Sequence, residues 1–502
     1  MIADFVVVGT GSAGAVLADR LSADGTTQVV VLEAGAADNN QFIHIPAAFS
    51  KLFRSEFDWD YSTEPQPELA DRRIFWPRGK TLGGSSSMNA MMWVRGLPAD
   101  YDEWGELAGE DWSYAAVQQR LDRIEDGPLA LNQQRSPRSI TGAWLEAAEQ
   151  CGHRGFVQTT VCQRRGARWS TADAYLRPAL RRTNLHLRTG ATATRVLFEG
   201  NRAIGVEYES DGRRHTVMAR REVVLCGGAI NSPQLLMLSG IGPREHLVEH
   251  GIDVVRDVPE VGANLLDHLL VVLGFDANCD TLTGAEKPAQ LLNYLTRRRG
   301  MLTSNVGEAY GFMRSQADLD QPDVELIFAP APFFDEGIGE PYPRDAVTMG
   351  PILVKPKSTG TIRLASADPL AKPIIDPRYL SDPEGADRQA LLAGLRAVAE
   401  IAQAPALKGL LGGIARPIGG RELDDATLEL ALATTSHTLY HPTTTCRMGS
   451  DEGSVVDPQL RVRGVDGLRV ADASVMPTII RGHTHAPSVL IGEKAADYLT
   501  TS

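Results

Sequence analysis

The first 35 residues constrain the fold of this chain more than any other segment. The apolar run FVVV (5–8) leads directly into a glycine-rich turn at 9–14, and a second apolar run (29–32) ends on an acidic residue. Strand, glycine turn, helix and strand in this order let the backbone and the helix N-terminus approach a pyrophosphate, and the acid accepts hydrogen bonds from a ribose. This setting favours a dinucleotide site over an ordinary glycine turn. The residues assigned to the site are Gly9, Gly11, Ser12, Gly14 and Glu33.

Length and texture predict an α/β chain (α+β overall) of two domains. At 502 residues the chain exceeds the size at which single hydrophobic cores stop growing. Strand-like runs mixed with amphipathic helical runs fill 266–430, and the texture of the N-terminal part returns at 431–502. We therefore expect a Rossmann-like cofactor-binding domain at 1–265, completed by 431–502, and a sheet-plus-helices substrate domain at 266–430.

Several local elements follow from the same patterns. Residues 36–80 and 124–142 are expected to be mainly loop, and 88–96 to be helical. Strands are expected at 323–329 and 360–364, and helices at 387–402 and around 491–499. The run Arg297–Arg299 is interpreted as a solvated helix end and not as a phosphate site.

Composition excludes several functional classes. The net charge of −13 argues against nucleic acid or an anionic membrane surface as the main partner. Five scattered cysteines without CxxC spacing indicate reduced thiols and neither a disulfide framework nor a zinc site. No apolar run is long enough to span a membrane, and the first strand leaves no room for a signal peptide. We expect a cytoplasmic monomer or homodimer that acts on a small molecule.

Two further motifs carry candidate chemistry. Gly83-Gly84-Ser85 lies in a turn flanked by apolar residues, which favours a second contact to a pyrophosphate over a flexible linker. Near the C-terminus, His441 precedes a proline, and the segment GHTHAP contains His483 and His485. Histidine suits proton transfer near neutral pH, and an i, i+2 histidine pair without a third ligand does not make a metal site. Two histidines delivered to one place would activate an alcohol.

Taken together, the motifs resemble the glucose–methanol–choline (GMC) family of flavin-dependent oxidoreductases, and among its members the choline-dehydrogenase-like and alcohol oxidase branch. The resemblance runs nearly end to end. The motifs that carry it are the N-terminal fingerprint with LEAG, RGKTLGGSSSMNAMMWVRG (78–96), STADAYLRP (170–178), GGAINSPQLLMLSGIGP (227–243), VGANLLDH (261–268), SNVGEA (304–309), IDPRYLSDP (375–383), HPTTTCRMG (441–449) and LRVADASVMP (468–477).

The resemblance implies FAD buried between the two domains. The N-terminal glycines and Glu33 would hold the ADP half of the cofactor. The further cofactor contacts that it implies are Gly83, Gly84, Ser85, Asn89, Val196, Asp472, Ala473 and His485. Relatives that bind flavin covalently carry a histidine where this chain has Met88, so we expect a dissociable cofactor.

The implied reaction is oxidation of a primary alcohol to an aldehyde. His441 would accept the hydroxyl proton while hydride passes to flavin N5, and His483 would hold the same oxygen. Oxygen or another acceptor would then take the electrons, and an FAD-containing lyase of the same family is the alternative. The expected substrate pocket, for which plain core packing is an equal alternative, consists of Trp93, Glu308, Phe312, Phe333 and Phe334. The region after Asp126 lacks a pattern that many members show and is expected to form a shortened loop.

Overall fold

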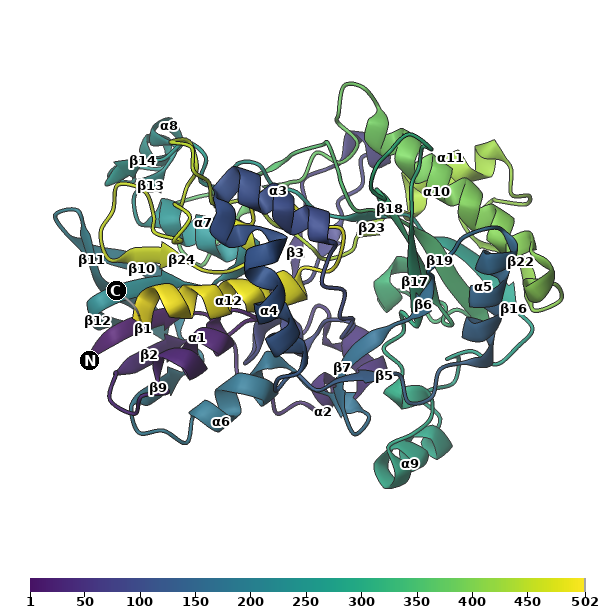
Figure 1. The fold of residues 1–502 in the computed structure, drawn as a ribbon, viewed down its shortest axis with the longest axis horizontal. Helices are drawn as coiled ribbons and strands as arrows, with labels where there is room; N and C mark the ends of the chain where they lie inside the picture. Colours follow the sequence, from purple (N-terminus) through teal and green to yellow (C-terminus); the bar gives the residue numbers. More distant parts are fainter. Residues whose placement is uncertain (501–502) are drawn as a thin grey trace.

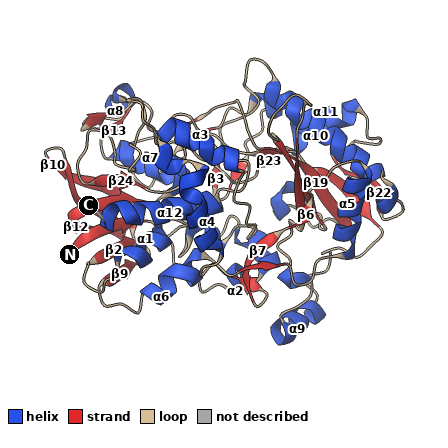
Figure 2. Ribbon diagram, in the orientation of Figure 1, coloured by secondary structure: helices blue, strands red, loops and turns tan. Residues whose placement is uncertain are grey.

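The computed structural model describes residues 1–500, which form two halves, each centred on a sheet (Figures 1 and 2). The first half contains a seven-stranded sheet in the order β10-β11-β12-β1-β2-β9, with β24 beside β12. Its strands are β1 (Ile2–Val8), β2 (Val29–Leu32), β9 (Leu185–Arg188), β10 (Thr192–Glu199), β11 (Arg202–Ser210), β12 (Arg213–Leu225) and β24 (Leu468–Val470). The pairings among β1, β2, β9, β12 and β24 are parallel, and those among β10, β11 and β12 are antiparallel.

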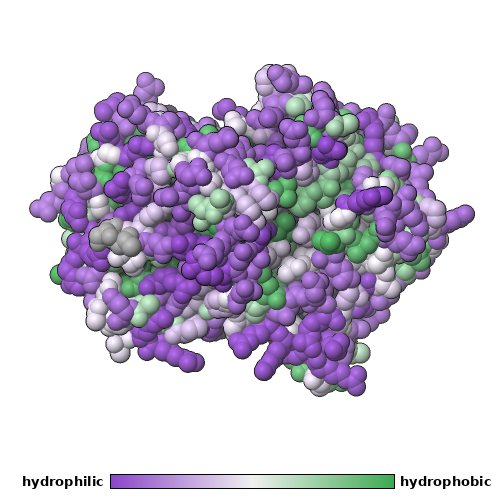
Figure 3. Space-filling model, viewed as in Figure 1, coloured by the Kyte–Doolittle hydropathy of each residue, from purple (hydrophilic) through white to green (hydrophobic). Residues whose placement is uncertain are grey.

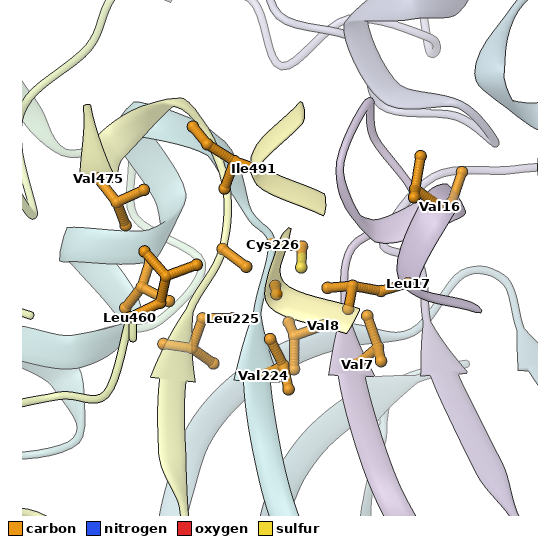
Figure 4. Close-up of a cluster of buried hydrophobic side chains, with 14 of the residues drawn as sticks. Val7, Val8, Val16, Leu17, Val224, Leu225, Cys226, Leu460, Val475 and Ile491 are labelled. Carbon is orange, nitrogen blue, oxygen red and sulfur yellow. The ribbon is translucent and has the colours of Figure 1, made fainter. Parts of the chain in front are cut away.

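The parallel strands are apolar on both faces because helices cover both faces of such a sheet. All four residues of β2 are buried, as are the last four of β1. Figure 4 shows the ends of β1 and β12 packed between α1 (Gly14–Leu21) and segments from near the C-terminus, including Val475 and Ile491. The first and last parts of the sequence therefore share one hydrophobic core.

The second half contains an eight-stranded antiparallel sheet in the order β22-β16-β19-β18-β17-β6, with β15 bridging β19 and β23. Its strands are β6 (Val157–Gln158), β15 (Leu269–Leu270), β16 (Leu273–Ala277), β17 (Ala309–Met313), β18 (Val324–Ala329), β19 (Ala346–Leu353), β22 (Leu411–Arg416) and β23 (His437–Thr438). One helix, α10 (Ala386–Gln403), packs along β18 and β19. Because α10 buries Leu391, Leu395 and Val398 against the sheet, this half has a separate core.

The remaining elements connect or cover the two sheets. The other helices are α2 (Gln41–His44), α3 (Pro98–Ala108), α4 (Tyr114–Glu125), α5 (Ser139–Gln150), α6 (Arg177–Ala179), α7 (Gly228–Leu238), α8 (Arg244–Glu249), α9 (Pro288–Arg297), α11 (Asp425–Thr435) and α12 (His485–Thr500). Short strands are β3 (Tyr61–Ser62), β4 (Phe75–Trp76), β5 (Leu131–Gln133), β7 (Thr160–Arg164), β8 (Ala167–Arg168), β13 (Ile241–Gly242), β14 (Arg256–Asp257), β20 (Thr361–Arg363) and β21 (Ile374–Asp376). Short 3₁₀ turns that matter below are η1 (Pro46–Leu52), η3 (Gly84–Ser87), η6 (Met301–Thr303) and η7 (Phe334–Gly337).

The structure confirms most of the predicted elements and corrects three. The strands, the helix at 387–402 and the closing helix are present, although α12 begins several residues earlier than expected. The predicted helix at 88–96 is wrong: after η3 the chain runs extended, because it pairs with the neighbouring strand β7 through Met92 and Val161. Residues 124–142 are not one loop, since α4, β5 and α5 all enter the range.

The predicted first segment, 1–265, is not confined to the first half. Helix α5 packs against α10 and β18, and β6 pairs with β17, so residues from within this segment belong with the second sheet. In the opposite direction, β23 from the C-terminal segment pairs with β15. The chain thus crosses between the halves several times, and hydrophobic surface gathers where they meet in the space-filling view (Figure 3).

Among the described residues, none of the helices combines the length and the apolar composition needed to cross a bilayer.

Candidate active site

A cavity of about 450 Å³ extends from the glycine turn after β1 to the histidines of the C-terminal segment. Both sheets contribute to its wall, because the turn after β1 and the end of β12 face residues of β15 and β18 across it. The residues assigned from sequence that line this cavity are Gly9, Gly11, Ser12, Glu33, Gly84, Ser85, Asn89, Phe333, His441, Asp472, Ala473, His483 and His485. The structure thus brings together residues separated by more than 400 positions in the sequence.

The three glycines of the first turn do different things. Gly9 has φ +105, and a Cβ there would lie 2.4 Å from the carbonyl oxygen of Cys226. A Cβ on Gly14 would lie 2.1 Å from the carbonyl oxygen of Gly9, so helix and strand pack too closely for any other residue. A Cβ on Gly11 would meet no protein atom within 4 Å, although Gly11 lines the cavity. Gly9 and Gly14 are therefore required by the fold, whereas Gly11 leaves space for a ligand.

Glu33 stands at the end of β2, where its carboxylate closes the glycine turn. Oε2 accepts hydrogen bonds from the backbone and hydroxyl of Thr10, and Oε1 accepts one from the Gly35 backbone at 2.9 Å. Burial raises the pKa of Glu33, and these donors partly offset that effect. Oε1 accepts only one of these hydrogen bonds and keeps a second lone pair, so Glu33 can still accept a hydrogen bond from a ribose in the cavity.

A second glycine turn lies directly against the first. Gly84 has φ +52, and a Cβ there would lie 2.8 Å from the Cα of Gly11. The backbone N–H of Gly83 donates to the Thr10 hydroxyl at 3.2 Å, which fixes the two turns relative to each other. Gly83 itself is not in the cavity wall, and neither is Gly14, because both are used in packing. The wall residues of the second turn are Gly84 and Ser85.

Asp472 joins the C-terminal segment to α7. Oδ1 accepts from the backbone and hydroxyl of Ser474, and Oδ2 accepts from the Gly228 backbone and the Ser232 hydroxyl. Burial raises the pKa of Asp472, although these four donors favour the ionised form. A Cβ on Gly228 would meet no protein atom within 4 Å, so the wall is open here as it is at Gly11. These two openings, with the paired glycine turns, fit an extended dinucleotide.

Val196, the predicted adenine contact, lies outside the cavity wall. The backbone N–H of Val196 donates to the Ser239 hydroxyl at 2.8 Å, and its side chain is fully buried. Val196 is therefore not available to a ligand. The cavity instead reaches the beginning of β10, at Ala191, Thr192 and Ala193.

His441 and His483 meet at the other end of the cavity. Their ring centroids are 4.8 Å apart, with an interplanar angle of 56°. His441 follows β23, which pairs with β15, and His483 precedes α12. A Cβ on Gly482 would lie 2.7 Å from the carbonyl oxygen of Val94, so a glycine is needed where this segment passes the extended chain at 94–96. The pairing of β23 with β15 positions the His441 ring, and the hydrogen bond from the His483 backbone N–H to the Val94 carbonyl positions the His483 ring.

His441 is held by two neighbours from the VGANLLDH segment. Its Nδ1 lies 2.9 Å from Nδ1 of His268, and its backbone N–H donates to Asp267 at 2.8 Å. Burial holds the pKa of His441 well below its usual range, and the charges of His483 and His268 act in the same direction. Burial also lowers the pKa of His268 to about 3. His441 is therefore neutral near pH 7, with Nε2 as the nitrogen left to face the cavity.

His483 has a different partner. Its Nε2 lies 3.1 Å and 3.3 Å from the two carboxylate oxygens of Glu325 on β18, a side chain with no exposed surface. Because Nε2 is engaged by a carboxylate, Nδ1 is the nitrogen of His483 that remains for a ligand. One histidine of the pair has a histidine neighbour and the other has an acid, so the two rings have unequal roles.

The sequence did not single out Glu325, Asp267 or His268. His268 ends a motif that carries the family resemblance, and that motif was the available signal. Glu325 had a weaker one, an acidic residue inside the otherwise apolar strand VELIFA. Only the packing of β18 against the C-terminal segment identifies its partner.

Four residues of the predicted substrate pocket lie outside the cavity wall. Glu308 is buried outside the cavity wall, and its carboxylate accepts hydrogen bonds from Thr141, Ser304 and the Arg138 backbone, so it is directed into the protein interior. The aromatic residues placed elsewhere pack in the protein interior or against neighbouring strands: Trp93 against His485, Phe312 against Tyr310 and Phe334 against Tyr342. Only Phe333 lines the cavity.

His485 opens α12 and contacts the first glycine turn. Its Nδ1 lies 2.8 Å from the hydroxyl of Ser12, and burial lowers its pKa to about 4. Asn89 is fixed by a different group, since its Oδ1 accepts from Arg168 at 2.7 Å. Both side chains therefore have defined orientations in the wall between the glycine turns and the histidine pair.

A group of potential metal ligands lies on α8, away from the cavity. His246, Glu249 and His250 are close together among the described residues. However, Nε2 of His246 accepts the backbone N–H of Leu364 at 3.0 Å. The proton of the neutral ring is then on Nδ1, the nitrogen nearest Glu249, so this ring offers no lone pair to an ion there.

A two-sheet α/β protein whose dinucleotide-type cavity ends at a histidine pair is a nucleotide-dependent oxidoreductase in architecture. Two family models, both described as GMC oxidoreductase, match residues 3–270 and 356–492. The chain belongs to the GMC oxidoreductase family, as its motifs predicted.

Similar proteins extend over the whole chain. An uncharacterised GMC-type oxidoreductase of Mycobacterium tuberculosis is 67% identical, with 99% of each chain covered. The alcohol dehydrogenase [acceptor] of Pseudomonas putida is 40% identical over 99% of this chain and 95% of its own. Among solved structures, a formate oxidase of Aspergillus oryzae, studied for modification of its FAD, superimposes with a TM-score of 0.92 at 27% identity and covers 100% of this chain and 98% of its own. These relatives are oxidoreductases, which disfavours the lyase alternative.

Proposed function

We propose that this protein oxidises a primary alcohol to an aldehyde, with His441 as the base and FAD as the electron acceptor. The chain is a GMC-family flavoprotein, and relatives named for alcohol oxidation and for FAD support the reaction class. The observation that carries the proposal is the unequal histidine pair at the end of the cavity.

The residues that would hold the cofactor are those of the two glycine turns, Glu33 and the Asp472 segment. Bound FAD supplies a two-electron acceptor for the hydride of the alcohol carbon and passes the electrons to oxygen or another acceptor. Met88 lines the cavity and offers no nitrogen for a covalent link, which supports a dissociable cofactor.

His441 is suited to take the proton of the hydroxyl group. Its low pKa keeps the ring neutral, and in the tautomer whose Nδ1–H donates to Nδ1 of His268, Nε2 is the proton acceptor. Asp267 accepts from the backbone N–H of His441, and the contact of Nδ1 with His268 orients the ring. A general base placed in this way accelerates a reaction by roughly 10²–10⁴-fold.

His483 is suited to hold the alcohol oxygen. Nε2–H donates to Glu325, and Nδ1, when it also carries a proton, donates to the oxygen that gains negative charge. A charged His483 also lowers the pKa of His441, which keeps the proton acceptor free. The carboxylate of Glu325 thus acts through His483 and does not touch the substrate.

The substrate end of the cavity is mainly apolar. Its wall contains Leu270, Val272, Ile327, Phe333 and Leu439. No acidic side chain among the described residues lines this end, since Glu308 points into the interior. This lining favours a neutral alcohol with an aliphatic or aromatic chain over a quaternary ammonium substrate.

The test is anaerobic reduction of the bound flavin by a panel of primary alcohols. We expect at least one alcohol to bleach the visible flavin absorbance, and His441→Ala to slow bleaching by roughly 10²–10⁴-fold with unchanged flavin content. His186→Ala, on β9 and outside the cavity, is the matched control. Unchanged bleaching in His441→Ala would remove His441 as the base, and no bleaching by any alcohol would refute the proposed reaction. Peroxide measurement then separates an oxidase from a dehydrogenase.

A further inference from the structure

Helix α9 (Pro288–Arg297) presents its apolar side to solvent. Leu291, Leu292 and Leu295 are 41%, 63% and 60% exposed. At 3.6 residues per turn these three leucines lie on one side of the helix. Beside this leucine face Tyr294, which is 1% exposed, packs with Ile45 in a small hydrophobic cluster. The helix thus has the reverse orientation of an ordinary amphipathic surface helix, whose apolar face is buried.

Figure 1 shows α9 projecting from the edge of the molecule. It packs on η6, which in turn packs on η1. Its leucine face is therefore unobstructed by either half of the protein.

The same region is strongly basic. Residues 287–307 contain four basic residues, Lys287 and Arg297–Arg299, and no acidic ones. The turn between β7 and β8 adjoins the end of α9, since Gly166 in this turn lies against the carbonyl of Arg298. This turn adds two exposed basic residues, Arg164 and Arg165. Among the described residues, none of these arginines forms a salt bridge. The nearby acids are already paired, Glu286 with Lys51 and Asp280 with Arg138.

We propose that α9 and the adjoining arginines dock on a membrane surface that contains anionic lipids. Exposed leucines on one face of a short helix, flanked by basic residues, are the pattern of a helix that lies in the lipid interface. The net charge of −13, from which the sequence argued against an anionic membrane surface, is a sum over the whole chain, and charges more than about 8–10 Å from the lipid are largely screened at physiological salt. The electrostatic attraction to the lipid therefore depends on the local charge of the patch and not on the net charge of the chain.

Other occupants fit the patch less well. In a second copy docked α9 against α9, Arg297–Arg299 would meet the same arginines in a parallel pair or Lys287 in an antiparallel pair, and like charges repel. Nucleic acid would engage the arginines but leave three leucines without a partner. A lipid surface satisfies the leucines with acyl chains and the arginines with headgroups at the same time.

The experiment measures binding of the flavin-loaded enzyme to vesicles by flotation. Vesicles of phosphatidylcholine mixed with phosphatidylglycerol are compared with phosphatidylcholine alone. We expect binding to the mixed vesicles only, weakened by added salt. The double variant Leu292→Gln/Leu295→Gln should reduce the partition coefficient at least tenfold, and Arg297→Gln/Arg299→Gln by roughly fivefold for each charge removed.

Matched controls use equally exposed residues elsewhere. Val248→Gln on α8 removes a side chain with 62% exposure, and Arg214→Gln removes an exposed charge on β12. Both should bind vesicles as the wild type does, and all variants should keep the wild-type unfolding temperature, since every substituted side chain is exposed. Failure of the wild type to bind mixed vesicles overturns the proposal. The proposal is also overturned if the wild type sediments as a dimer and the leucine variant sediments as a monomer, because a second copy of the chain then covers the leucine face.

Discussion

Replacing Glu325 with glutamine isolates the contribution of one buried charge to the histidine pair. The carboxylate has no exposed surface and lies 3.1 Å from Nε2 of His483. A hydrogen bond to a charged group contributes about 1.5–3 kcal/mol. Lost entirely in the transition state, that energy corresponds to roughly a 10-fold to 150-fold change in rate. Because glutamine keeps the shape of the side chain and one acceptor oxygen, we expect kcat/KM to fall by roughly 10-fold to 100-fold.

The assay is steady-state oxidation of an alcohol from the panel, with flavin content measured on the same samples. Glu325 is outside the cavity wall, so the flavin content should not change. Glu308→Gln is the matched control, because Glu308 also has no exposed surface but bonds to Thr141 and Ser304 and not to a histidine. It should keep kcat/KM within a few-fold of the wild type.

Two outcomes would refute this reasoning. If Glu325→Gln retains wild-type kcat/KM, the carboxylate does not tune His483. If Glu308→Gln loses as much activity as Glu325→Gln, then Glu308 acts on the substrate, as the sequence first indicated, and the geometry described above is not the one that governs catalysis.

Further predictions separate ligand binding, pH dependence and packing. Gly14→Ala should destabilise the protein by about 1–3 kcal/mol through overpacking. Gly11→Ala places its Cβ where no protein atom lies within 4 Å, so it should keep the stability of the cofactor-free protein and weaken flavin binding in a titration. Equal destabilisation by both substitutions would contradict the separate roles given to Gly14 in packing and Gly11 in ligand binding. Burial raises the pKa of Glu336 from 4.5 to about 8, so its stabilising contribution is complete below pH 4.5 and is lost as the pH rises to 8. The difference in unfolding temperature between Glu336→Gln and the wild type should therefore grow in favour of the variant as the pH rises from 4.5 to 8. A difference that stays constant over these pH values would contradict the raised pKa of Glu336. Trp144→Ala should cost about 3–5 kcal/mol, because the buried ring stacks on Phe156 and Phe328; denaturant unfolding measures this, and a loss under 1 kcal/mol would be inconsistent with that packing.

The N-terminal unit shows why part of the fold could be predicted. The strand, the glycine turn and Glu33 are all specified by residues close together in sequence, and each has a local physical reason. The predicted helix at 88–96 was wrong for the opposite reason, since its apolar residues pair with β7, which is distant in sequence. Val196 lies outside the cavity wall because its backbone N–H is bonded to Ser239, a contact that the local sequence does not reveal.

The sequence by itself determined the dinucleotide-type unit, the family and two histidines that could handle a proton. The sequence could not determine which acidic residues contact the two histidines, because this depends on which strand of the second sheet faces the C-terminal segment. Glu308 immediately precedes β17 and Glu325 lies on the neighbouring strand β18; both are buried, and only Glu325 reaches His483. The orientation of α9 is a second case, since Tyr294, and not the leucines, is the side chain of this helix that is buried against the protein. Tertiary structure decided both, because burial and partnership are properties of packed surfaces and not of local sequence.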